Sequence, residues 1–311
     1  MIETLLALLA NVLLSGAPPG ALDDPSRVLT EVVPEGRVLF AETEKRVGSP
    51  TLVQETLGPD MSAESYVVID VGTGKVLTAA NPSAIRPVAS LTKLLTARTV
   101  AERTDPDAVV TVSPRATRAG RRGADMDLVA HERITVRNLL AGLLIPSAND
   151  AAVALAEHVS GTEENFADAM NRVAQSLGLS RTHVVNATGL DHPAHFSSAY
   201  DMGLLLAHVW RDPLLGLYLR AAALDVPSVN GKETHHLRTT NRLLGKRTDI
   251  LAGKTGFTDA AGQSLAIVAE NDDGSPVVAV LLGSKDRFRD MDNLLNWTFW
   301  AYRWPAATNH E

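Results

Sequence analysis

Ser90 and Lys93 are the residues whose types and spacing most readily suggest chemistry in this chain. Pro87 stands just upstream, and leucines recur at helical spacing from Leu91 onward, so the stretch predicts the first turns of a helix. Residues three apart are neighbours on a helix, which would place the Ser90 hydroxyl beside the Lys93 amine. Such a pair can act as a nucleophile and its base if the amine is kept neutral. The pattern alone is weak, because a chain of this length contains about one Ser-x-x-Lys by chance.

Two more short motifs follow, a Ser147-Ala148-Asn149 triplet and a Lys254-Thr255-Gly256 triplet. Residues 135–145 have the leucine spacing of a helix, and Pro146 ends it because proline disfavours helical geometry in the residue before it. A new helix is expected from about Asp150, so the first triplet lies in a tight connection between helices. The second triplet precedes a predicted hairpin and is expected on a strand.

The elements that must position these motifs begin and end with strands. Residues 66–70 and 75–79 flank a glycine-containing loop, and residues 264–270 and 276–284 flank Asn-Asp-Asp-Gly, so each pair predicts a β-hairpin. Helices are expected between the hairpins and after them, at 135–145, 150–159, 163–177, from 198–201 onward, and at 286–304. This order implies one sheet built from both chain ends, with a mostly helical lobe at about 105–215 beside it.

Composition and charge limit the classes of partner. The chain has 311 residues, 45% of them hydrophobic, a net charge of −7 and no cysteine. It has no general basic footprint for nucleic acid, and it cannot use disulfides, thiol catalysis or cysteine metal sites. Residues 105–132 are irregular and carry four arginines, which favours a solvated loop over an electropositive rim for an anionic polymer. The paired histidines, His192 with His195 and His235 with His236, are interpreted as surface loop residues rather than metal ligands.

The N-terminal segment bears on location. Residues 5–14 are apolar and small residues follow, which resembles the apolar region of a secretory signal, although residues 1–3 lack the usual basic side chain. A buried or frayed helix, or a start site placed too far downstream, would also explain this segment. We therefore expect a signal or anchor at 1–16, an extension or linker at 17–61, a catalytic domain at 62–304 and a tail at 305–311.

The three motifs together carry a family resemblance. Ser-x-x-Lys, Ser-x-Asn and Lys-Thr-Gly in this order are the signature of penicillin-binding proteins and class A β-lactamases. The chain resembles the serine D-alanyl-D-alanine carboxypeptidases of the low-molecular-mass penicillin-binding protein family over about residues 62–304. Further stretches agree, at residues 70–77, 89–97, 186–191, 198–201 and 254–262. The resemblance implies an α/β (α+β) fold of the β-lactamase/transpeptidase type, with an antiparallel sheet flanked by helices.

The resemblance also implies a mechanism. Ser90 would attack a peptide carbonyl and become an acyl-enzyme, with Lys93 as its base. An unperturbed lysine has a pKa of about 10.4, so burial and the nearby cation of Lys254 would have to lower it. Ser147 would relay a proton to the leaving amine and bridge the two lysines.

The substrate would add to the edge of the Lys254 strand as an extended peptide. Asn149 would bond Lys93 or the substrate amide, and Thr255 the terminal carboxylate. Gly256 would allow close backbone approach. The backbone amides of Ser90 and Phe257 would form the oxyanion hole. The implied binding residues are Asn149, Lys254, Thr255, Gly256 and Phe257.

The implied substrate is a peptidoglycan stem peptide ending in D-Ala-D-Ala, cleaved in the cell envelope without a cofactor and inhibited by β-lactams. Three alternatives share the motifs: a class A-like β-lactamase, a D-alanyl endopeptidase and a non-catalytic cell-wall peptide-binding module. No Glu-x-x-Leu-Asn element follows Ser147, which disfavours the lactamase, and the absence of Gly-x-Ser-x-Gly disfavours an α/β-hydrolase. The aromatic segment 296–304 is expected to be a core helix rather than an interfacial one. Any membrane association, if weakly present, would come from residues 1–16.

Overall fold

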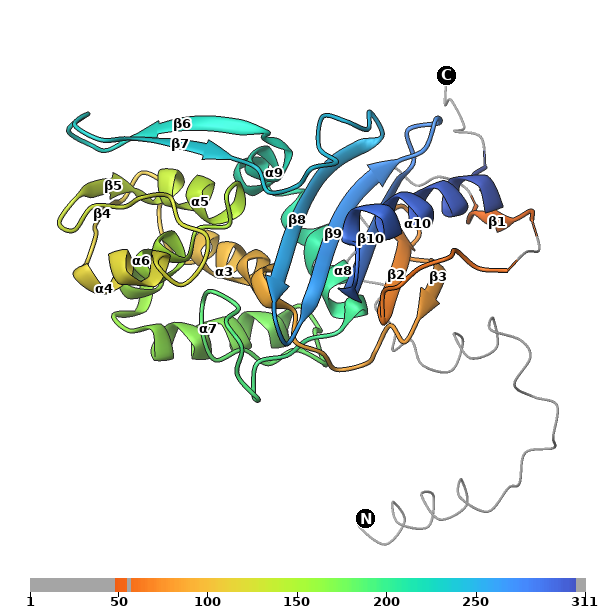
Figure 1. Ribbon diagram of the computed structural model, residues 1–311, viewed down its shortest axis with the longest axis horizontal. Coiled ribbons are helices and arrows are strands. Elements are labelled where there is room, and N and C mark those ends of the chain that lie inside the picture. Colours follow the sequence, from red (N-terminus) through yellow and green to blue (C-terminus); the bar gives the residue numbers. More distant parts are fainter. Residues whose placement is uncertain (1–47, 55–56, 306–311) are drawn as a thin grey trace, which may run out of the picture. The chain divides into compact units, whose positions relative to one another are not determined.

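The computed structural model describes residues 48–54 and 57–305. The expected signal or anchor at 1–16, most of the extension at 17–61 and the end of the tail lie outside the described residues. Figure 1 shows the central feature of the described part, an antiparallel sheet in the order β3-β2-β10-β9-β8. Its strands are β2 (Ser65–Asp70), β3 (Val76–Ala80), β8 (Ile250–Thr258), β9 (Gly262–Glu270) and β10 (Pro276–Ser284). The expected pairing of the two chain ends is confirmed, since β2 pairs with β10.

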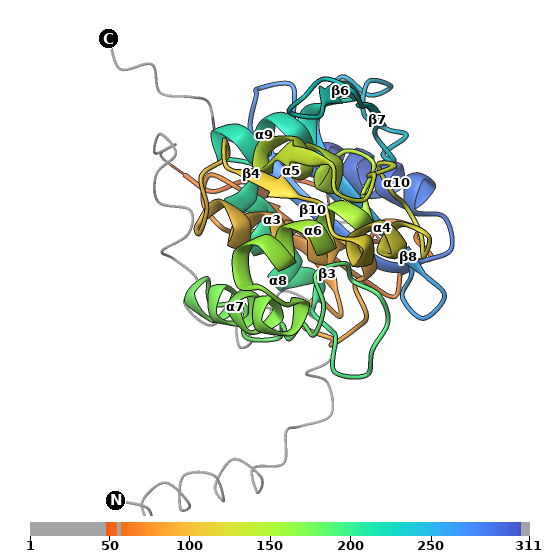
Figure 2. The same cartoon turned by 90° about the vertical axis from the view of Figure 1, so that its left-hand side faces the viewer.

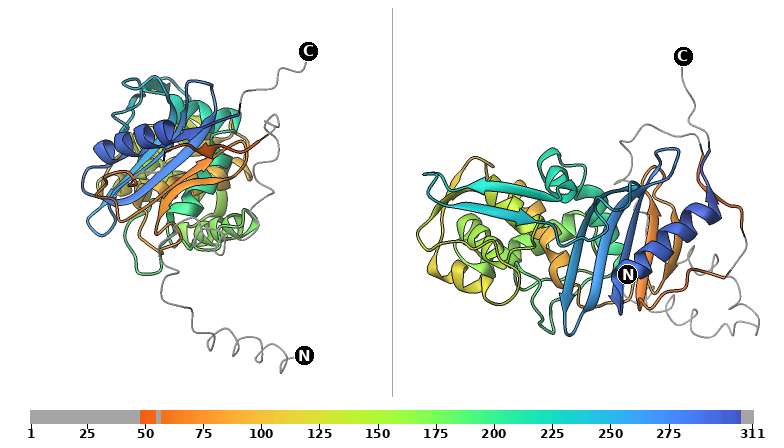
Figure 3. Two further views of the ribbon diagram at one scale, coloured as in Figure 1. Left: turned by 90° about the vertical axis from the view of Figure 1, so that its right-hand side faces the viewer. Right: turned by 45° about the horizontal axis from the view of Figure 1, so that its top comes forward.

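Both faces of this sheet are buried, which explains the long apolar runs of its strands. Alternate residues of one strand point to opposite faces. Val67 packs in the core cluster that contains the residues of α8 (Ala199–Val209), whereas Val68 packs in the cluster of α10 (Arg287–Ala301). The two helices accordingly cover opposite faces of the sheet (Figures 1 and 3). α8 falls within the residues expected for the helical lobe but packs on the sheet.

The helices next to the sheet form the lobe seen end-on in Figure 2. Its members are α3 (Thr92–Ala101), α4 (Pro114–Gly120), α5 (Val136–Leu144), α6 (Asn149–Ser160), α7 (Glu163–Ser176) and α9 (Pro213–Arg220). Side-chain caps define the starts that the sequence predicts. Thr135 accepts from Asn138 N, Thr162 from Asn165 N and Ser198 from Asp201 N.

Three parts of the chain differ from the sequence-based expectation. The stretch expected to be irregular, 105–132, contains the strand β4 (Val109–Thr111) and the helix α4, which Ser113 caps. It is followed directly by the strand β5 (Arg133–Thr135), which pairs with β4. The segment before β8 holds α9 and a hairpin of β6 (Ala223–Pro227) and β7 (Thr234–Arg238). α10 ends at Ala301 because β11 (Tyr302–Arg303) pairs with β1 (Thr51–Leu52).

The aromatic segment expected to be a core helix belongs to the core only in part: Tyr302 is buried, whereas Trp300 is 48% exposed and the helix ends at Ala301. Leu294, Leu295 and Ala301 are fully buried in the cluster between α10 and the sheet. In the described part of the chain, no helix combines the length and the apolar character that crossing a membrane requires.

Candidate active site

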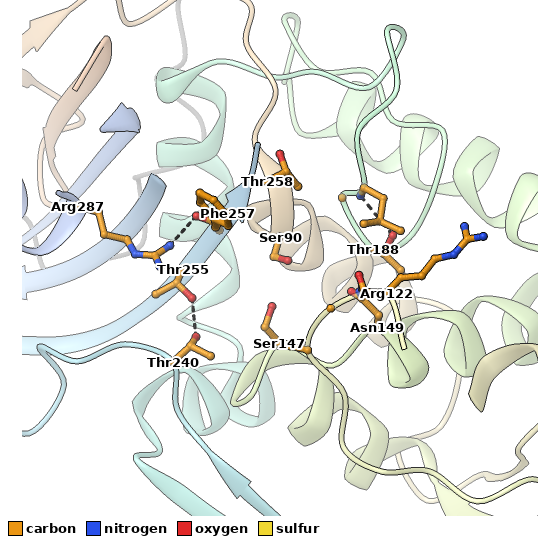
Figure 4. Close-up of a pocket in the computed structure, with 15 residues that line it drawn as sticks. Ser90, Arg122, Ser147, Asn149, Thr188, Thr240, Thr255, Phe257, Thr258 and Arg287 are labelled. Carbon is orange, nitrogen blue, oxygen red and sulfur yellow. Dashed lines mark hydrogen bonds between the residues drawn. The ribbon is translucent and has the colours of Figure 1, made fainter. Parts of the chain in front are cut away.

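All three sequence motifs line one pocket of about 190 Å³. Ser90 comes from the 3₁₀ turn η1 (Ala89–Leu91) and Thr255 from β8. Ser147 lies in the connection between α5 and α6, and Asn149 is the first residue of α6. Figure 4 shows the Ser90 and Ser147 hydroxyls directed into the same space. The structure thus brings together residues that stand far apart in the sequence.

The Ser90 turn is held in an unusual backbone conformation. Ala89 has φ +48°, in the left-handed region that residues with a side chain rarely adopt. Strand β8 is one of the two edge strands of the sheet and lies directly against this turn. A Cβ on Gly256 would be 3.0 Å from the Val88 carbonyl oxygen and 3.2 Å from the Ser90 nitrogen. The glycine therefore lets the strand approach the nucleophile closely.

Lys93 is fully buried at the floor of the site. Its Nζ lies 2.9 Å from Ser90 Oγ, 2.8 Å from Asn149 Oδ1 and 2.8 Å from the Thr188 carbonyl oxygen. Burial lowers the pKa of Lys93 to about 7, and the negative charge of Asp150 acts in the opposite direction. A buried amine near neutrality can accept a proton from a hydroxyl.

The second lysine contacts the second serine. Lys254 Nζ donates to Ser147 Oγ at 2.7 Å and to the Thr255 carbonyl at 2.9 Å. Burial lowers the pKa of Lys254 well below its ordinary value, and the charges of Lys93 and Arg287 lower it further. Burial is the main cause of the lowered pKa at both lysines, and repulsion between the two ammonium groups adds to it at Lys254.

Two backbone features orient the Ser-x-Asn triplet. Ser147 has φ +71° directly after the proline that ends α5, which turns its side chain toward Lys254. Asn149 opens α6, and its backbone N–H donates to the Ala124 carbonyl. The Asn149 side-chain amide bonds Lys93 through Oδ1 and the Arg122 carbonyl through Nδ2 at 3.4 Å. The amide therefore bridges the lysine and the pocket wall.

One end of the pocket carries hydroxyls and a guanidinium. Thr255 Oγ1 lies 2.5 Å from Thr240 Oγ1, and Arg287 Nη1 donates to the Gly256 carbonyl at 2.7 Å. Arg287 Nε is buried without a hydrogen-bond partner among the described residues. This combination of donors suits a carboxylate. Phe257 is 56% exposed beside it and offers an apolar contact at the rim.

Two pocket residues, Thr240 and Arg287, have no sequence signal that would have singled them out. Thr188 lies in a stretch that resembles the family, and Arg122 is one of the arginines interpreted as part of a solvated loop, but neither was predicted to line the site. The histidine prediction was wrong for two residues. His195 and His235 are buried, with 4% and 5% exposure, and their ring nitrogens bond protein groups. No group of three His, Cys, Asp or Glu side chains within residues 48–54 and 57–305 is arranged to hold a metal ion.

Comparison with known proteins agrees with this geometry. The D-alanyl-D-alanine carboxypeptidase family matches residues 52–286. D-alanyl-D-alanine carboxypeptidase DacA of Haemophilus influenzae is 33% identical over 258 residues, which are 78% of this chain and 63% of that protein. The D-alanyl-D-alanine endopeptidase of Pseudomonas aeruginosa is 34% identical over 78% of this chain and 78% of its own length.

Solved structures show the same fold. The Streptomyces K15 DD-transpeptidase superposes with a TM-score of 0.74 at 25% identity, covering 79% of this chain and 100% of that one. A D-alanyl-D-alanine carboxypeptidase from Mycobacterium tuberculosis gives a TM-score of 0.74 at 27% identity, covering 82% and 97%. The expected fold class is thereby confirmed. The chain belongs to the D-alanyl-D-alanine carboxypeptidase family, peptidase family S11.

Proposed function

We propose that this protein is a serine-type D-Ala-D-Ala carboxypeptidase that acts on peptidoglycan stem peptides through an acyl-enzyme on Ser90 and is inhibited by penicillin. The observation that carries the proposal is the set of three contacts made by the Lys93 amine. The family match supports the reaction class. The hydroxyls of Thr240 and Thr255 and the guanidinium of Arg287, which could together bind a carboxylate, support cleavage next to a free C-terminus.

The contacts of Lys93 orient its lone pair. A neutral lysine amine has two N–H donors and one lone pair, whereas a carbonyl oxygen can only accept. The Asn149 and Thr188 oxygens therefore take the two N–H groups. The third direction points at Ser90 Oγ, 2.9 Å away, so the lone pair faces the hydroxyl proton. With its pKa near 7, a substantial share of Lys93 is neutral at neutral pH.

Acylation then follows from this arrangement. Ser90 Oγ forms a bond to the carbonyl carbon of the penultimate D-alanine, and its proton moves to Lys93 Nζ. The carbonyl oxygen becomes an oxyanion, which the backbone N–H groups of Ser90 and Phe257 would stabilise. The C–N bond breaks, and the leaving D-alanine amine gains a proton through the Ser147 hydroxyl. Ser147 in turn receives the proton that Lys93 removed from Ser90, so the Ser147 hydroxyl is restored and Lys93 is neutral again.

Deacylation returns the enzyme to its starting state. A water molecule adds to the ester carbon and gives its proton to Lys93, and Ser90 Oγ leaves with a proton. The sum is one peptide bond and one water converted into a shortened peptide and D-alanine. A class A-like β-lactamase reaction is less well supported, because none of the described residues that line the pocket is acidic.

The polar residues that line the pocket suggest how the substrate is recognised. The D-alanine carboxylate would accept from the Thr255 hydroxyl and from Arg287, in the field of buried Lys254. Asn149 lies where its side chain can meet the substrate amide. The peptide itself would run along the outer edge of β8, adding backbone hydrogen bonds on the side of the strand that does not face β9.

The decisive experiment uses diacetylated L-Lys-D-Ala-D-Ala and follows the release of D-alanine. Release is expected from the wild type, and it should be lost in Ser90→Ala and Lys93→Ala and blocked by penicillin. Lys285→Ala, at an exposed lysine, is the matched control and should retain activity. Release that persists in Ser90→Ala would contradict the mechanism.

Two further outcomes separate the alternatives. Hydrolysis of cross-linked peptide dimers into monomers, with no free D-alanine from the tripeptide, would favour a D-alanyl endopeptidase. Binding of peptide without covalent labelling of Ser90 by a fluorescent penicillin would favour a recognition module. We also propose that the protein works in the cell envelope, where such peptides occur, with any weak membrane association coming from residues 1–16. Detection of the protein only in the cytosol after cell fractionation would contradict that location.

A further inference from the structure

His195 is a buried histidine outside the pocket for which the proposed reaction has no role. Its side chain lies between the loop 185–195 and helix α3, with 4% of its surface exposed. Its Nε2 is 2.8 Å from Thr92 Oγ1, and its Nδ1 accepts from the Val185 N–H at 3.3 Å. Thr92 directly precedes Lys93 in the chain. The ring therefore joins the loop to the helix beside the base.

The hydrogen bonds determine the form of this imidazole. Val185 N–H can only donate, so Nδ1 must carry the lone pair and Nε2 the proton. Nε2–H then donates to the Thr92 hydroxyl. Burial lowers the pKa of His195 to about 4, and the nearby His183 and His192 act in the same direction while Asp191 opposes them. A protonated ring would set one N–H against another, so the neutral tautomer is the form that fits.

The same loop supplies the Thr188 carbonyl that bonds Lys93. Asn186 Oδ1 accepts from the Thr188 and Gly189 backbone N–H groups, which makes the turn rigid. The turn is attached to α3 by a second bond, from Thr96 Oγ1 to the Ala187 carbonyl at 2.8 Å. Thr92 and Thr96 thus hold the loop on either side of Lys93 in the sequence.

We propose that His195 is a positioning residue for the general base. By joining Val185 to Thr92, it holds the Thr188 carbonyl where that oxygen takes one N–H of Lys93. If the carbonyl moves away, the neutral amine keeps a single acceptor, and an N–H can turn toward Ser90 in place of the lone pair. Acylation becomes slower, whereas substrate binding at Thr255 and Arg287 is unaffected. The inference rests on the proposed function.

The test compares His195→Leu with His195→Gln. Leucine fills the space without polar atoms, while glutamine offers one acceptor and one donor, as the neutral ring does. We expect His195→Leu to lower kcat and the rate of penicillin acylation by about tenfold, which corresponds to one hydrogen bond. KM should stay within about twofold, and His195→Gln should recover most of the rate. His192→Leu, at an exposed histidine in the same loop, is the matched control.

The outcomes are distinguishable. Penicillin titration gives the fraction of His195→Leu that is folded and reactive. If that fraction is acylated at the wild-type rate, His195 has a structural role only and the inference is overturned. A change confined to KM would overturn it as well. If His195→Leu does not fold, Thr92→Val removes the partner of Nε2 and should show the same loss of kcat; an unchanged kcat would overturn the inference. A wild type that neither reacts with penicillin nor releases D-alanine would defeat the proposed function itself, and this inference with it.

Discussion

His235 Nε2 lies 2.7 Å from Glu132 Oε1, and the two side chains are only 4% and 3% exposed. His235 Nδ1 is 2.7 Å from the Met126 carbonyl oxygen, so both ring nitrogens face acceptors. An imidazolium satisfies both contacts, since it donates from Nδ1 to the Met126 carbonyl and from Nε2 to Glu132. The pair joins the β6–β7 hairpin to the loop whose beginning, at Arg122, Gly123 and Ala124, lines the pocket.

This ion pair predicts a loss of stability toward alkaline pH. The hydrogen bond and charge of Glu132 raise the pKa of His235 above its ordinary value. The stabilisation is therefore fully present below about pH 6.5 and is lost as the pH rises through the raised value in the folded protein. Glu132→Gln should lower the free energy of unfolding by about 3 kcal/mol at acidic pH and flatten its dependence on pH. Denaturant titrations of the wild type and of Glu132→Gln at a series of pH values measure this. If the free energy of unfolding depends on pH in the same way in both proteins, the prediction is refuted.

Acylation should depend on pH through Lys93. The base must be neutral, and its pKa is about 7, so the rate of penicillin acylation should rise with pH up to that value and then level off. Below that pH, the acylation rate should fall about tenfold for each unit by which the pH is lowered. Stopped-flow labelling over about pH 5 to 9 tests this. An acylation rate that does not change below pH 7 would mean that another group accepts the Ser90 proton.

Removal of the Arg287 guanidinium should weaken recognition of the terminal carboxylate. Arg287→Gln is expected to lower kcat/KM for the free-acid tripeptide by about 10- to 100-fold, the range of a charge-assisted hydrogen bond. The C-terminal amide of the same peptide should be affected much less, because it carries no charge to bind. Arg118→Gln, at an exposed arginine on α4, serves as the control. Equal losses for acid and amide would show that Arg287 does not bind the carboxylate.

Gly189 should tolerate no side chain. It has φ +85°, and a Cβ would lie 2.0 Å from the Ala89 carbonyl oxygen in the turn that carries Ser90. Gly189→Ala should therefore lower the stability by about 3 kcal/mol or more, through backbone strain and overpacking together. Gly178→Ala is a matched control, since Gly178 has φ +70° with no atom within 4 Å of such a Cβ. Gly178→Ala should lower the free energy of unfolding by about 1 kcal/mol, from backbone strain alone. Equal melting temperatures for the two variants would argue against the close contact.

The predictions from sequence succeeded where local signals sufficed. The hairpins, the helix starts at Thr135, Thr162 and Ser198, and the strand that carries Lys254 follow from turn residues, caps and periodicity within a few residues. Helix α4 and the β6–β7 hairpin were not predicted, because they are short and their apolar residues show little periodicity. The end of α10 before Tyr302 was not predicted either, because it depends on the pairing of Tyr302 with Leu52, far away in the sequence.

For the candidate site, the sequence by itself determined which motifs are present and the order in which they occur, because residue type and local spacing carry that information. Only the tertiary structure decided that Thr188, Thr240 and Arg287 line the pocket and that His195 and His235 are buried. The roles of the two histidines depend on contacts with residues 103 positions away, His195 with Thr92 and His235 with Glu132. Such contacts leave no periodic trace in the chain, since they arise from the packing of whole elements rather than from the sequence around each residue.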